Sequence, residues 1–239
     1  MQVLAKTFPY ISYLNTGVTI VSLAIFDLDN TLLGGDSDHA WGEFLVKHQL
    51  VDRDAYEQAN DYFLQQYQQG GLDIDEFLAF ALKPLAQHPK QQLDQWHQQF
   101  MQESIAPLRL AKADQLLQQH RNKGDYLLII TATNLFVTEP IAKSLGVDHI
   151  LATVPEFIDG AYTGKVSGTP CFQAGKVERL QQWLTETDME LEDSYFYSDS
   201  HNDLPLLELV THPFAVDPDP ILSKHAQQQQ WPIISLRDD

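Results

Sequence analysis

Residues 21–31 have the sequence VSLAIFDLDNT. The nearly continuous apolar run over 21–26 is typical of a short strand that is buried on both faces, as in a parallel sheet. The run ends abruptly at Asp27, and a second carboxylate follows at Asp29. Open α/β sheets bind their ligands outside the carboxyl ends of the strands. The stretch therefore predicts a buried strand whose ligand-facing end carries two carboxylates.

Three further segments are short apolar runs of the kind that is typical of buried strands. Residues 125–131 form the second strand and end in Thr131, and residues 195–197 form the third and lead into SDSHND at 198–203. A fourth strand is expected at 213–216. Helical patterns at 135–145 and 172–186, and a hairpin signal at Asp159-Gly160, lie between these strands. The alternation predicts the α/β fold class, with a Rossmann-like, doubly wound parallel sheet.

A glutamine-rich segment at 36–112 interrupts this alternation. Its apolar residues recur at helical spacing, and it contains no strand-like stretch. We therefore expect a helical cap domain at 36–112 that is inserted into an α/β core made of 21–35 and 113–239. Residues 1–20 are expected to be an N-terminal extension, and we assign them no role.

The composition excludes several classes of function. The 239 residues include 15 Lys and Arg against 33 Asp and Glu, which gives a formal net charge of −18. Such an acidic surface repels nucleic acids and anionic lipids, so we expect neither as a partner. A single cysteine, Cys171, excludes an internal disulfide framework and a Cys-rich zinc site. No apolar run predicts a membrane span, and residues 1–20 lack the features of a secretory signal, so the expected location is the cytoplasm.

Polar residues stand at the ends of three of the predicted strands. They are Asp27 and Asp29, Thr131, and Asp199 and Asp203. In a parallel sheet these ends open on one edge, where four carboxylates would repel one another unless a cation neutralised them. Oxygen ligands without His or Cys suit Mg²⁺, and a bound Mg²⁺ attracts phosphate. Lys176, on the helix predicted at 172–186, can supply a second positive charge.

In their order along the chain, these residues resemble the four motifs of the haloacid dehalogenase superfamily. The motifs are DLDNT at 27–31, Thr131, Lys176, and DSHND at 199–203. The resemblance covers about residues 21–235. It implies the fold of that superfamily, and the helical insertion after the first motif is similar to the class that includes the phosphoserine phosphatases.

Two further segments look like the subfamily IB hydrolases of this superfamily. They are DSD at 36–38 with Trp41, and GTPCF at 168–172 leading to Gly175-Lys176. Some members of that subfamily are histidinol-phosphate phosphatases. The resemblance therefore implies a hydrolase whose substrate is a small soluble phosphate monoester.

The resemblance implies roles for the first two carboxylates. Asp27 would attack the phosphorus in line and become an aspartyl-phosphate. Asp29 would protonate the leaving oxygen and later take a proton from the attacking water. Because a halide leaves without a proton, the presence of Asp29 favours a phosphate ester over a halogenated substrate.

The resemblance also implies how the other polar residues would act. Mg²⁺ would be held by the carboxylates of Asp27 and Asp199 and by the main-chain carbonyl of Asp29. Asp203 would act through water or through Lys176. Thr131 and the backbone N–H of Ala132 would bind phosphate oxygens, and Lys176 would hold both the nucleophile and the transferring group.

The choice of substrate would lie with the cap. Asp36 and Asp38 are candidates to bind a cationic group, and the equally weighted alternative is that they cap a helix that begins before Trp41. Phosphoserine phosphatases carry an arginine for the substrate carboxylate, and the nearest basic residue in the corresponding region is Lys83. This departure favours an amine without a carboxylate, such as histidinol phosphate, over phosphoserine.

Other functions on the same fold stay open. A phosphotransferase would pass the phosphoryl group to an alcohol, and a non-catalytic binding protein is disfavoured because every catalytic position is filled. A response-regulator receiver ranks far lower, because it normally lacks both a large helical insertion and a carboxylate two residues after the nucleophile.

His201 is expected either to line the pocket or to pack its own loop. The oligomeric state is left open between monomer and dimer.

Overall fold

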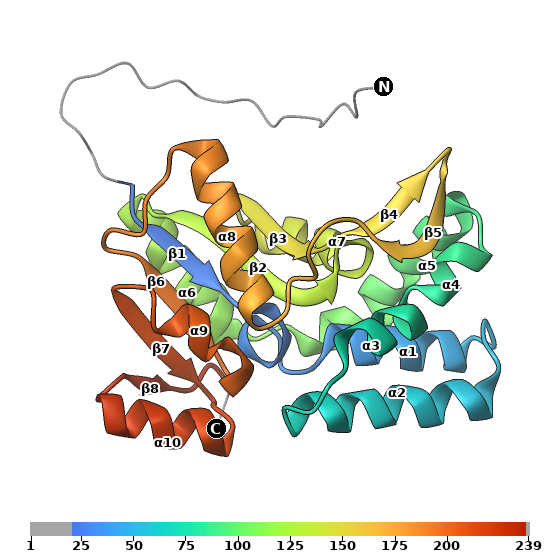
Figure 1. Cartoon of the computed structure of the whole chain (residues 1–239), viewed down its shortest axis with the longest axis horizontal. Coiled ribbons are helices and arrows are strands. Elements are labelled where there is room, and N and C mark those ends of the chain that lie inside the picture. The colour runs from blue at the N-terminus through green and yellow to red at the C-terminus, as the bar shows by residue number, and fades with distance from the viewer. Residues whose placement is uncertain (1–20, 238–239) are drawn as a thin grey trace.

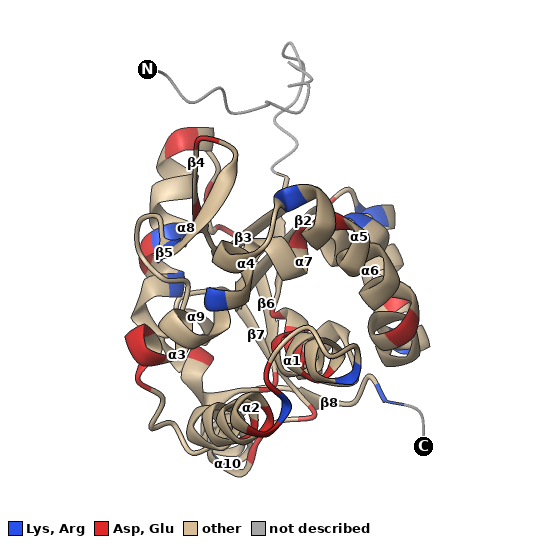
Figure 2. Ribbon diagram, turned by 90° about the vertical axis from the view of Figure 1, so that its right-hand side faces the viewer, with Lys and Arg blue, Asp and Glu red and all other residues tan. Residues whose placement is uncertain are grey.

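The computed structural model describes residues 21–237 (Figure 1). The expectations for residues 1–20 fall outside this range. No helix within residues 21–237 combines the length and the apolar character that crossing a lipid bilayer requires. In the ribbon of Figure 2 the positions of Lys and Arg are scattered over several elements of the described chain.

The core of the molecule is a six-stranded sheet in the order β3-β2-β1-β6-β7-β8. Every neighbouring pair in it is parallel. Its strands are β1 (Leu23–Phe26), β2 (Tyr126–Asn134), β3 (His149–Thr153), β6 (Tyr195–Ser198), β7 (His212–Val216) and β8 (Ile233–Ile234). The prediction of an α/β fold with a doubly wound parallel sheet is confirmed, and the four predicted strands are among those observed.

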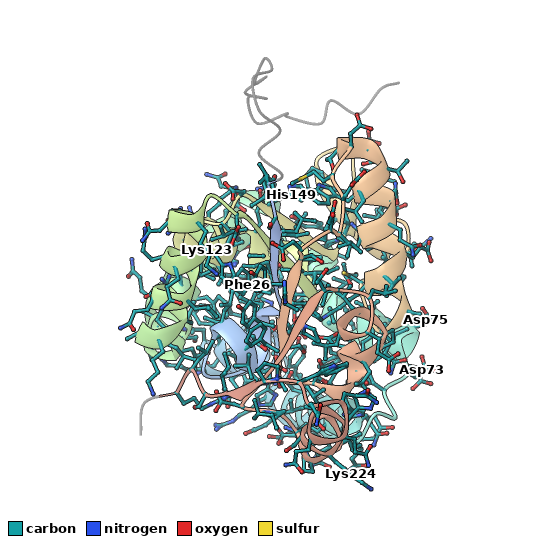
Figure 3. The ribbon with its side chains drawn as sticks, turned by 90° about the vertical axis from the view of Figure 1, so that its left-hand side faces the viewer. Phe26, Asp73, Asp75, Lys123, His149 and Lys224 are labelled. Atoms are coloured by element: carbon teal, nitrogen blue, oxygen red, sulfur yellow. The ribbon has the colours of Figure 1, made fainter. Side chains whose placement is uncertain are left out.

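Helices cover both faces of the sheet, and β1 shows why its sequence is apolar throughout. Alternate residues of a strand point to opposite faces. Ala24 and Phe26 pack on the side of α6 (Ala111–Lys123) and α7 (Leu135–Leu145), whereas Leu23 and Ile25 pack on the side of α8 (Ala174–Thr187). Figure 3 shows the labelled Phe26 between the two helical layers. The same face as α8 carries α9 (Leu204–Leu207) and α10 (Pro220–Gln229).

The segment predicted to be helical consists of helices. They are α1 (Ser37–Lys47), α2 (Arg53–Gln68), α3 (Ile74–Ala81), α4 (Lys83–Gln87), α5 (Lys90–Phe100) and short turns that end at Leu108. The chain leaves and re-enters the core at neighbouring points, because Leu33 and Arg109 form an isolated antiparallel bridge. We call residues 36–112 the helical insertion, and their standing as a separate cap domain remains a prediction.

A small hairpin from the core reaches the helical insertion. It consists of β4 (Pro155–Ile158) and β5 (Ala161–Val166), and its turn is the predicted Asp159-Gly160. Strand β5 packs against α3 and α4 (Figure 1). The insertion is therefore held from two directions, by its own connections to β1 and α6 and by this hairpin.

Candidate active site

The ends of β1, β2 and β6 meet, because β1 lies between the other two strands. Asp27 directly follows β1, and its backbone N–H donates to the carbonyl of Tyr197 on β6 at 2.9 Å. The turn after Asp27 contains Asn30 with φ of 57°, a left-handed conformation that asparagine tolerates better than most residues. This turn brings Thr31 back beneath the end of β6.

Lys176 lies at the centre of a buried charge cluster. The residue is only 1% exposed, and its Nζ lies 2.7 Å from Oδ1 of Asp27 and 2.8 Å from the carboxylate of Asp203. Ser198 donates a further hydrogen bond to Asp203 at 2.7 Å. Burial alone would lower the pKa of Lys176, but the carboxylates of Asp203 and Asp27 outweigh it and hold this pKa well above its usual value. Lys176 is therefore a fixed cation between two carboxylates.

A close backbone approach places Lys176 at the site. Gly175, in the first turn of α8, lies so near Pro170 that a Cβ at this position would collide with the Pro170 carbonyl oxygen. Glycine is the one residue type without a Cβ, so it permits this approach. The GTPCF segment and Gly175 thus bring the start of α8 against the ends of β1 and β6.

Asp199 is oriented by Thr31. The Thr31 hydroxyl donates to Oδ1 of Asp199 at 3.0 Å, and the backbone N–H of Asp199 donates back to Thr31 Oγ1 at 3.1 Å. Burial and the nearby Asp27 raise the pKa of Asp199 well above its usual value. Burial likewise raises the pKa of Asp27 to about 7, although Lys176 opposes this shift. Without a further cation beside Lys176, the charged forms of Asp27 and Asp199 are therefore disfavoured.

This arrangement fits a divalent cation. Within residues 21–237, no three His, Cys, Asp or Glu side chains are grouped so that they could hold a metal ion alone. The expected ligand set needs only the two carboxylates of Asp27 and Asp199, because its third member is the main-chain carbonyl of Asp29. All three are oxygen ligands, the type that Mg²⁺ prefers. An added cation would favour the charged forms of both carboxylates, which burial disfavours.

Asp29 follows two residues after Asp27, and its carboxylate is held at both oxygens. Oδ1 accepts the backbone N–H of Ser37 at 2.7 Å, and Oδ2 accepts the Thr133 hydroxyl at 2.8 Å. Burial raises the pKa of Asp29 to about 6, and the neighbouring Asp36 adds to the shift. A carboxyl with this pKa can both give and take a proton near neutral pH.

Strand β2 extends three residues beyond its predicted end at Thr131, and the extension contains a bulge. Thr131 pairs with Ala152 but Asn134 pairs with Thr153, so Ala132 and Thr133 have no partners in β3. The hydroxyl of Thr131 accepts the N–H of Thr133 at 3.3 Å, which leaves its proton free for another acceptor. Bulges of this kind re-aim side chains beside active sites.

A cavity lies over these strand ends. Its polar floor comes from β1 and β2, and its apolar wall comes from α2, α3 and their connection. The described residues that line it are Asp27, Asp29, Asp36, Asp38, His39, Asn60, Phe63, Leu64, Tyr67, Leu72, Ile74, Phe77, Thr131, Ala132 and Thr133. None of these lining residues is a lysine or an arginine. The cavity joins the expected catalytic residues to the helical insertion.

Asp36 and Asp38 both line the cavity, and one of them also caps a helix. Asp36 accepts the N–H groups of Asp38 and His39, each at 2.9 Å, so it is the N-cap of α1. Asp38 accepts a hydrogen bond from Asn134 at 3.2 Å. Burial, followed by the nearby Asp36 and Asp29, raises the pKa of Asp38 well above its usual value. The capping interpretation is therefore observed at Asp36, and the binding of a cationic group by this pair stays a prediction.

The structure does not bring Lys83 to the cavity. It is the first residue of α4, its side chain is exposed, and α4 packs against β5 instead of the strand ends. His201 does not line the cavity either. Its Nδ1 lies 2.8 Å from Asp219, and its ring packs against Gly70 in the connection between α2 and α3. Of the two interpretations for His201, loop packing is the observed one.

Sequence reasoning missed several polar residues that hold the site together. They are Thr31, Ser198, Thr133 and Asn134. Thr31 stands inside the first quoted motif and Ser198 directly precedes the fourth, so their position beside a strand end was a usable signal. Thr133 and Asn134 lie two and three residues after Thr131, but only the structure reveals that Thr133 lines the cavity and that Asn134 donates to Asp38.

Known proteins resemble this chain over most of its length. Residues 24–208 match the family described as haloacid dehalogenase-like hydrolase. The chain is similar to the histidinol-phosphatase of Neisseria meningitidis serogroup C (strain 8013), with 46% identity over 220 residues that cover 90% of this chain and 99% of the relative. It is also similar to phosphoserine phosphatase SerB1 of Mycobacterium tuberculosis (strain ATCC 25618 / H37Rv), with 30% identity over 92% of this chain and 72% of the relative.

Two solved structures resemble the fold. A protein with unknown function from Bordetella pertussis Tohama I has a TM-score of 0.86 and 44% identity, over 91% of this chain and 100% of that chain. A substrate-bound phosphoserine phosphatase has a TM-score of 0.67 and 19% identity, over 92% of this chain and 94% of that chain. At this identity the second likeness concerns the fold alone.

Proposed function

The chain belongs to the haloacid dehalogenase-like hydrolases and is a phosphatase of small phosphate monoesters, and from this premise we propose that it works with Mg²⁺ through an aspartyl-phosphate on Asp27. One observation carries the proposal above all others. The buried Lys176 lies 2.7 Å from Asp27, at a strand end that also presents Asp29 and Thr131 to one cavity. This is a carboxylate nucleophile beside a fixed cation, with a second carboxyl in reach.

The proposed reaction has two displacements. In the first, an oxygen of Asp27 forms a bond to phosphorus while the bond to the ester oxygen breaks, and Asp29 gives its proton to the leaving alcohol. In the second, water attacks the phosphorus, Asp29 takes a proton from it, and the bond from phosphorus to Asp27 breaks. The products are the alcohol and inorganic phosphate, and both carboxyl groups return to their starting states.

The remaining residues would bind and neutralise the phosphoryl group. The Thr131 hydroxyl and the Ala132 N–H would donate to its oxygens, and Lys176 would hold it against Asp27. Mg²⁺, held by Asp27, Asp199 and the Asp29 carbonyl, would supply positive charge to the phosphoryl oxygens when bound. Asp203 would keep Lys176 in place through their 2.8 Å contact. Positioning and charge neutralisation of this kind provide most of the rate in phosphoryl transfer.

We further propose that the alcohol part of the substrate is cationic and carries no carboxylate. Asp36 and Asp38 face the cavity, and no lysine or arginine is among the described residues that line it. A substrate carboxylate would therefore lie beside two further carboxyl groups, without a lysine or an arginine to bind it. The apolar wall, which includes Phe63 and Phe77, suits a ring. Histidinol phosphate meets these requirements better than phosphoserine, and the similarity to a histidinol-phosphatase supports this choice.

Asp38→Asn tests the cationic subsite. A charged hydrogen bond is worth about 1.5–3 kcal/mol, so we expect this variant to raise the KM for histidinol phosphate by about tenfold or more. The KM for p-nitrophenyl phosphate, which has no cation, should not change. The measurement is steady-state phosphate release with both substrates and with phosphoserine, on which the unmodified enzyme should be the least active.

The matched control for this test is Asp75→Asn. Asp75 lies on α3, and Figure 3 shows it on the outside of the molecule, so its loss removes the same charge without touching the cavity. An equal rise in KM for both substrates in Asp38→Asn would contradict the subsite. Faster hydrolysis of phosphoserine than of histidinol phosphate by the unmodified enzyme would contradict the choice of substrate.

Asp199→Asn tests the metal site without relying on activity. Mg²⁺ at saturation should raise the melting temperature of the unmodified protein by about 5 °C, because a ligand that binds the folded state stabilises it. In Asp199→Asn this Mg²⁺-dependent rise should vanish. Without metal the variant should be at least as stable as the unmodified protein, because it loses a charge that Asp27 repels. Differential scanning calorimetry with and without Mg²⁺ measures both effects.

The control is Glu190→Gln, which removes one exposed charge far from the described strand ends. It should keep the full Mg²⁺-dependent rise. A chelator should also stop hydrolysis by the unmodified enzyme. Full activity in the chelator, or an undiminished Mg²⁺ effect in Asp199→Asn, would count against the proposed metal site.

The proposal also includes the cellular location of the enzyme and the absence of a nucleic-acid partner. We keep the cytoplasm as its location, and the net charge of −18 supports the absence of a nucleic-acid partner. Cell fractionation and a nucleic-acid binding assay at low salt measure these two points. Sedimentation equilibrium decides between monomer and dimer.

A further inference from the structure

Thr133 touches the carboxyl that the proposed reaction uses as acid and base. Its hydroxyl donates to Oδ2 of Asp29 at 2.8 Å, and its side chain is buried, with 7% of the residue exposed. The other oxygen of Asp29 accepts the backbone N–H of Ser37 at 2.7 Å. One donor comes from the end of β2 and the other from the start of α1. The carboxyl is thus fixed from both the core and the helical insertion.

The bulge in β2 gives Thr133 this position. Ala132 and Thr133 have no partners in β3, and the Thr153 hydroxyl holds the bulge by donating to the Ala132 carbonyl at 2.8 Å. The N–H of Thr133 donates to Thr131. The local structure that turns Thr131 and Ala132 toward the expected phosphate therefore also turns Thr133 toward Asp29.

The two donors to Asp29 differ in what they permit. A backbone N–H can only donate, so Oδ1 of Asp29 remains an acceptor whenever Ser37 is in place. The Thr133 hydroxyl can instead donate or accept, so its bond to Oδ2 can persist in both protonation states, and we take Oδ2 as the oxygen that gives the proton to the leaving alcohol. The Thr133 hydroxyl is bonded to this oxygen, and an oxygen of a carboxyl has a second lone-pair direction for the proton. Thr133 thus decides in which direction Oδ2 presents its proton.

We propose that Thr133 is a positioning residue that aims Oδ2 of Asp29 at the leaving oxygen of the substrate. The inference rests on the proposed function, because it requires Asp29 to act as the acid. It concerns the first displacement, and in particular substrates whose alcohol is a poor leaving group. An aryl phosphate such as p-nitrophenyl phosphate releases a stable phenolate and needs little help from an acid.

The test compares Thr133→Val, Thr133→Ser and Asp29→Asn on an alkyl and an aryl phosphate. Valine keeps the branched shape and removes the hydroxyl, so kcat for histidinol phosphate should fall by about tenfold or more. The kcat for p-nitrophenyl phosphate should change little. Serine keeps the hydroxyl and should restore most of the rate on the alkyl substrate. Asp29→Asn should show the same selectivity with a larger loss.

Thr138→Val is the matched control. Thr138 is also a buried threonine near the end of β2, and its hydroxyl donates to the Asn134 carbonyl instead of to Asp29. Its loss should affect the alkyl and the aryl substrate equally. The Mg²⁺-dependent rise in melting temperature should persist in Thr133→Val, which shows that the metal site is intact.

The outcomes separate the inference from the proposed function. Suppose that Asp29→Asn lowers kcat more for the alkyl substrate than for the aryl substrate. If Thr133→Val then lowers both values of kcat equally, or changes neither, the role of Thr133 is wrong and the proposed reaction stands. If Thr133→Ser fails to recover the alkyl rate while it folds as well as the unmodified enzyme, the hydroxyl is not the active part and the inference fails. If Asp29→Asn itself lowers both rates equally, the acid role of Asp29 fails and the inference fails with it.

Discussion

Asp27→Asn is expected to lower kcat by roughly 10⁴-fold or more, because it replaces the proposed nucleophile with an amide that cannot attack phosphorus. The fold should persist. The amide oxygen can still accept from Lys176, and Lys176 keeps its 2.8 Å contact with Asp203. Phosphate release under single-turnover conditions measures the rate, and a thermal melt reports the fold.

A direct search for the covalent intermediate makes this prediction sharper. When the unmodified enzyme is quenched with acid during turnover, labelled phosphate should remain on the protein and should be released by hydroxylamine, which cleaves acyl phosphates. Asp27→Asn should retain no label. Asp125→Asn is a suitable control, because Asp125 lies at the other end of β2, 2.7 Å from His120, and should keep both the label and the rate. Substantial turnover by Asp27→Asn would remove Asp27 as the nucleophile.

The sequence predicts most strands of the sheet and the polar residues at their carboxyl ends, and there is one physical reason for both. A strand that is buried on both faces must be apolar along its whole length, so β1, at Leu23–Phe26, is visible as a run. Where the apolar core ends, polar residues are allowed, and the residues that follow are the candidates to face a ligand. The change from apolar to polar therefore marks the position of Asp27 and Thr131 without knowledge of the fold.

Features that depend on contacts between distant segments were not predictable in this way. The bulge that places Thr133 is held by Thr153, whose hydroxyl also accepts the N–H of Cys171 at 3.0 Å. No local pattern reveals such a contact. The edge strand β8 has only two residues and leaves no apolar run. These elements depend on tertiary packing, which a single sequence does not display.

The sequence predicts that the insertion is helical, but it does not predict which helix faces line the cavity. Helical periodicity marks an apolar face, yet it does not say whether that face packs against protein or lines a pocket. Phe63 and Tyr67 are one helical turn apart on α2, and both line the cavity. Lys83 lies in the same insertion but away from the cavity, because α4 packs on β5. The packing of helix on helix decides between these outcomes.

Lys176→Met is expected to lower both activity and stability. Methionine is of similar length, but it leaves Asp27 and Asp203 buried beside each other without a cation. Removal of one partner of a buried ion pair costs about 3–5 kcal/mol of unfolding free energy. The loss of a cation that stabilises the transferring group should lower kcat/KM by roughly 10²–10³-fold. Chemical denaturation and steady-state kinetics measure the two effects on the same protein.

The double variant Lys176→Met with Asp203→Asn separates these effects. Asp203 is 1% exposed and lies 2.8 Å from Lys176, so its neutralisation removes one of the two buried charges that Lys176→Met leaves unpaired. Stability should therefore recover in part. Activity should stay as low as in the single variant, because neither of the two introduced side chains supplies positive charge to the phosphoryl group. If kcat/KM recovered together with stability, Lys176 would be a structural cation only, and the proposed binding of the phosphoryl group by its ammonium would be wrong.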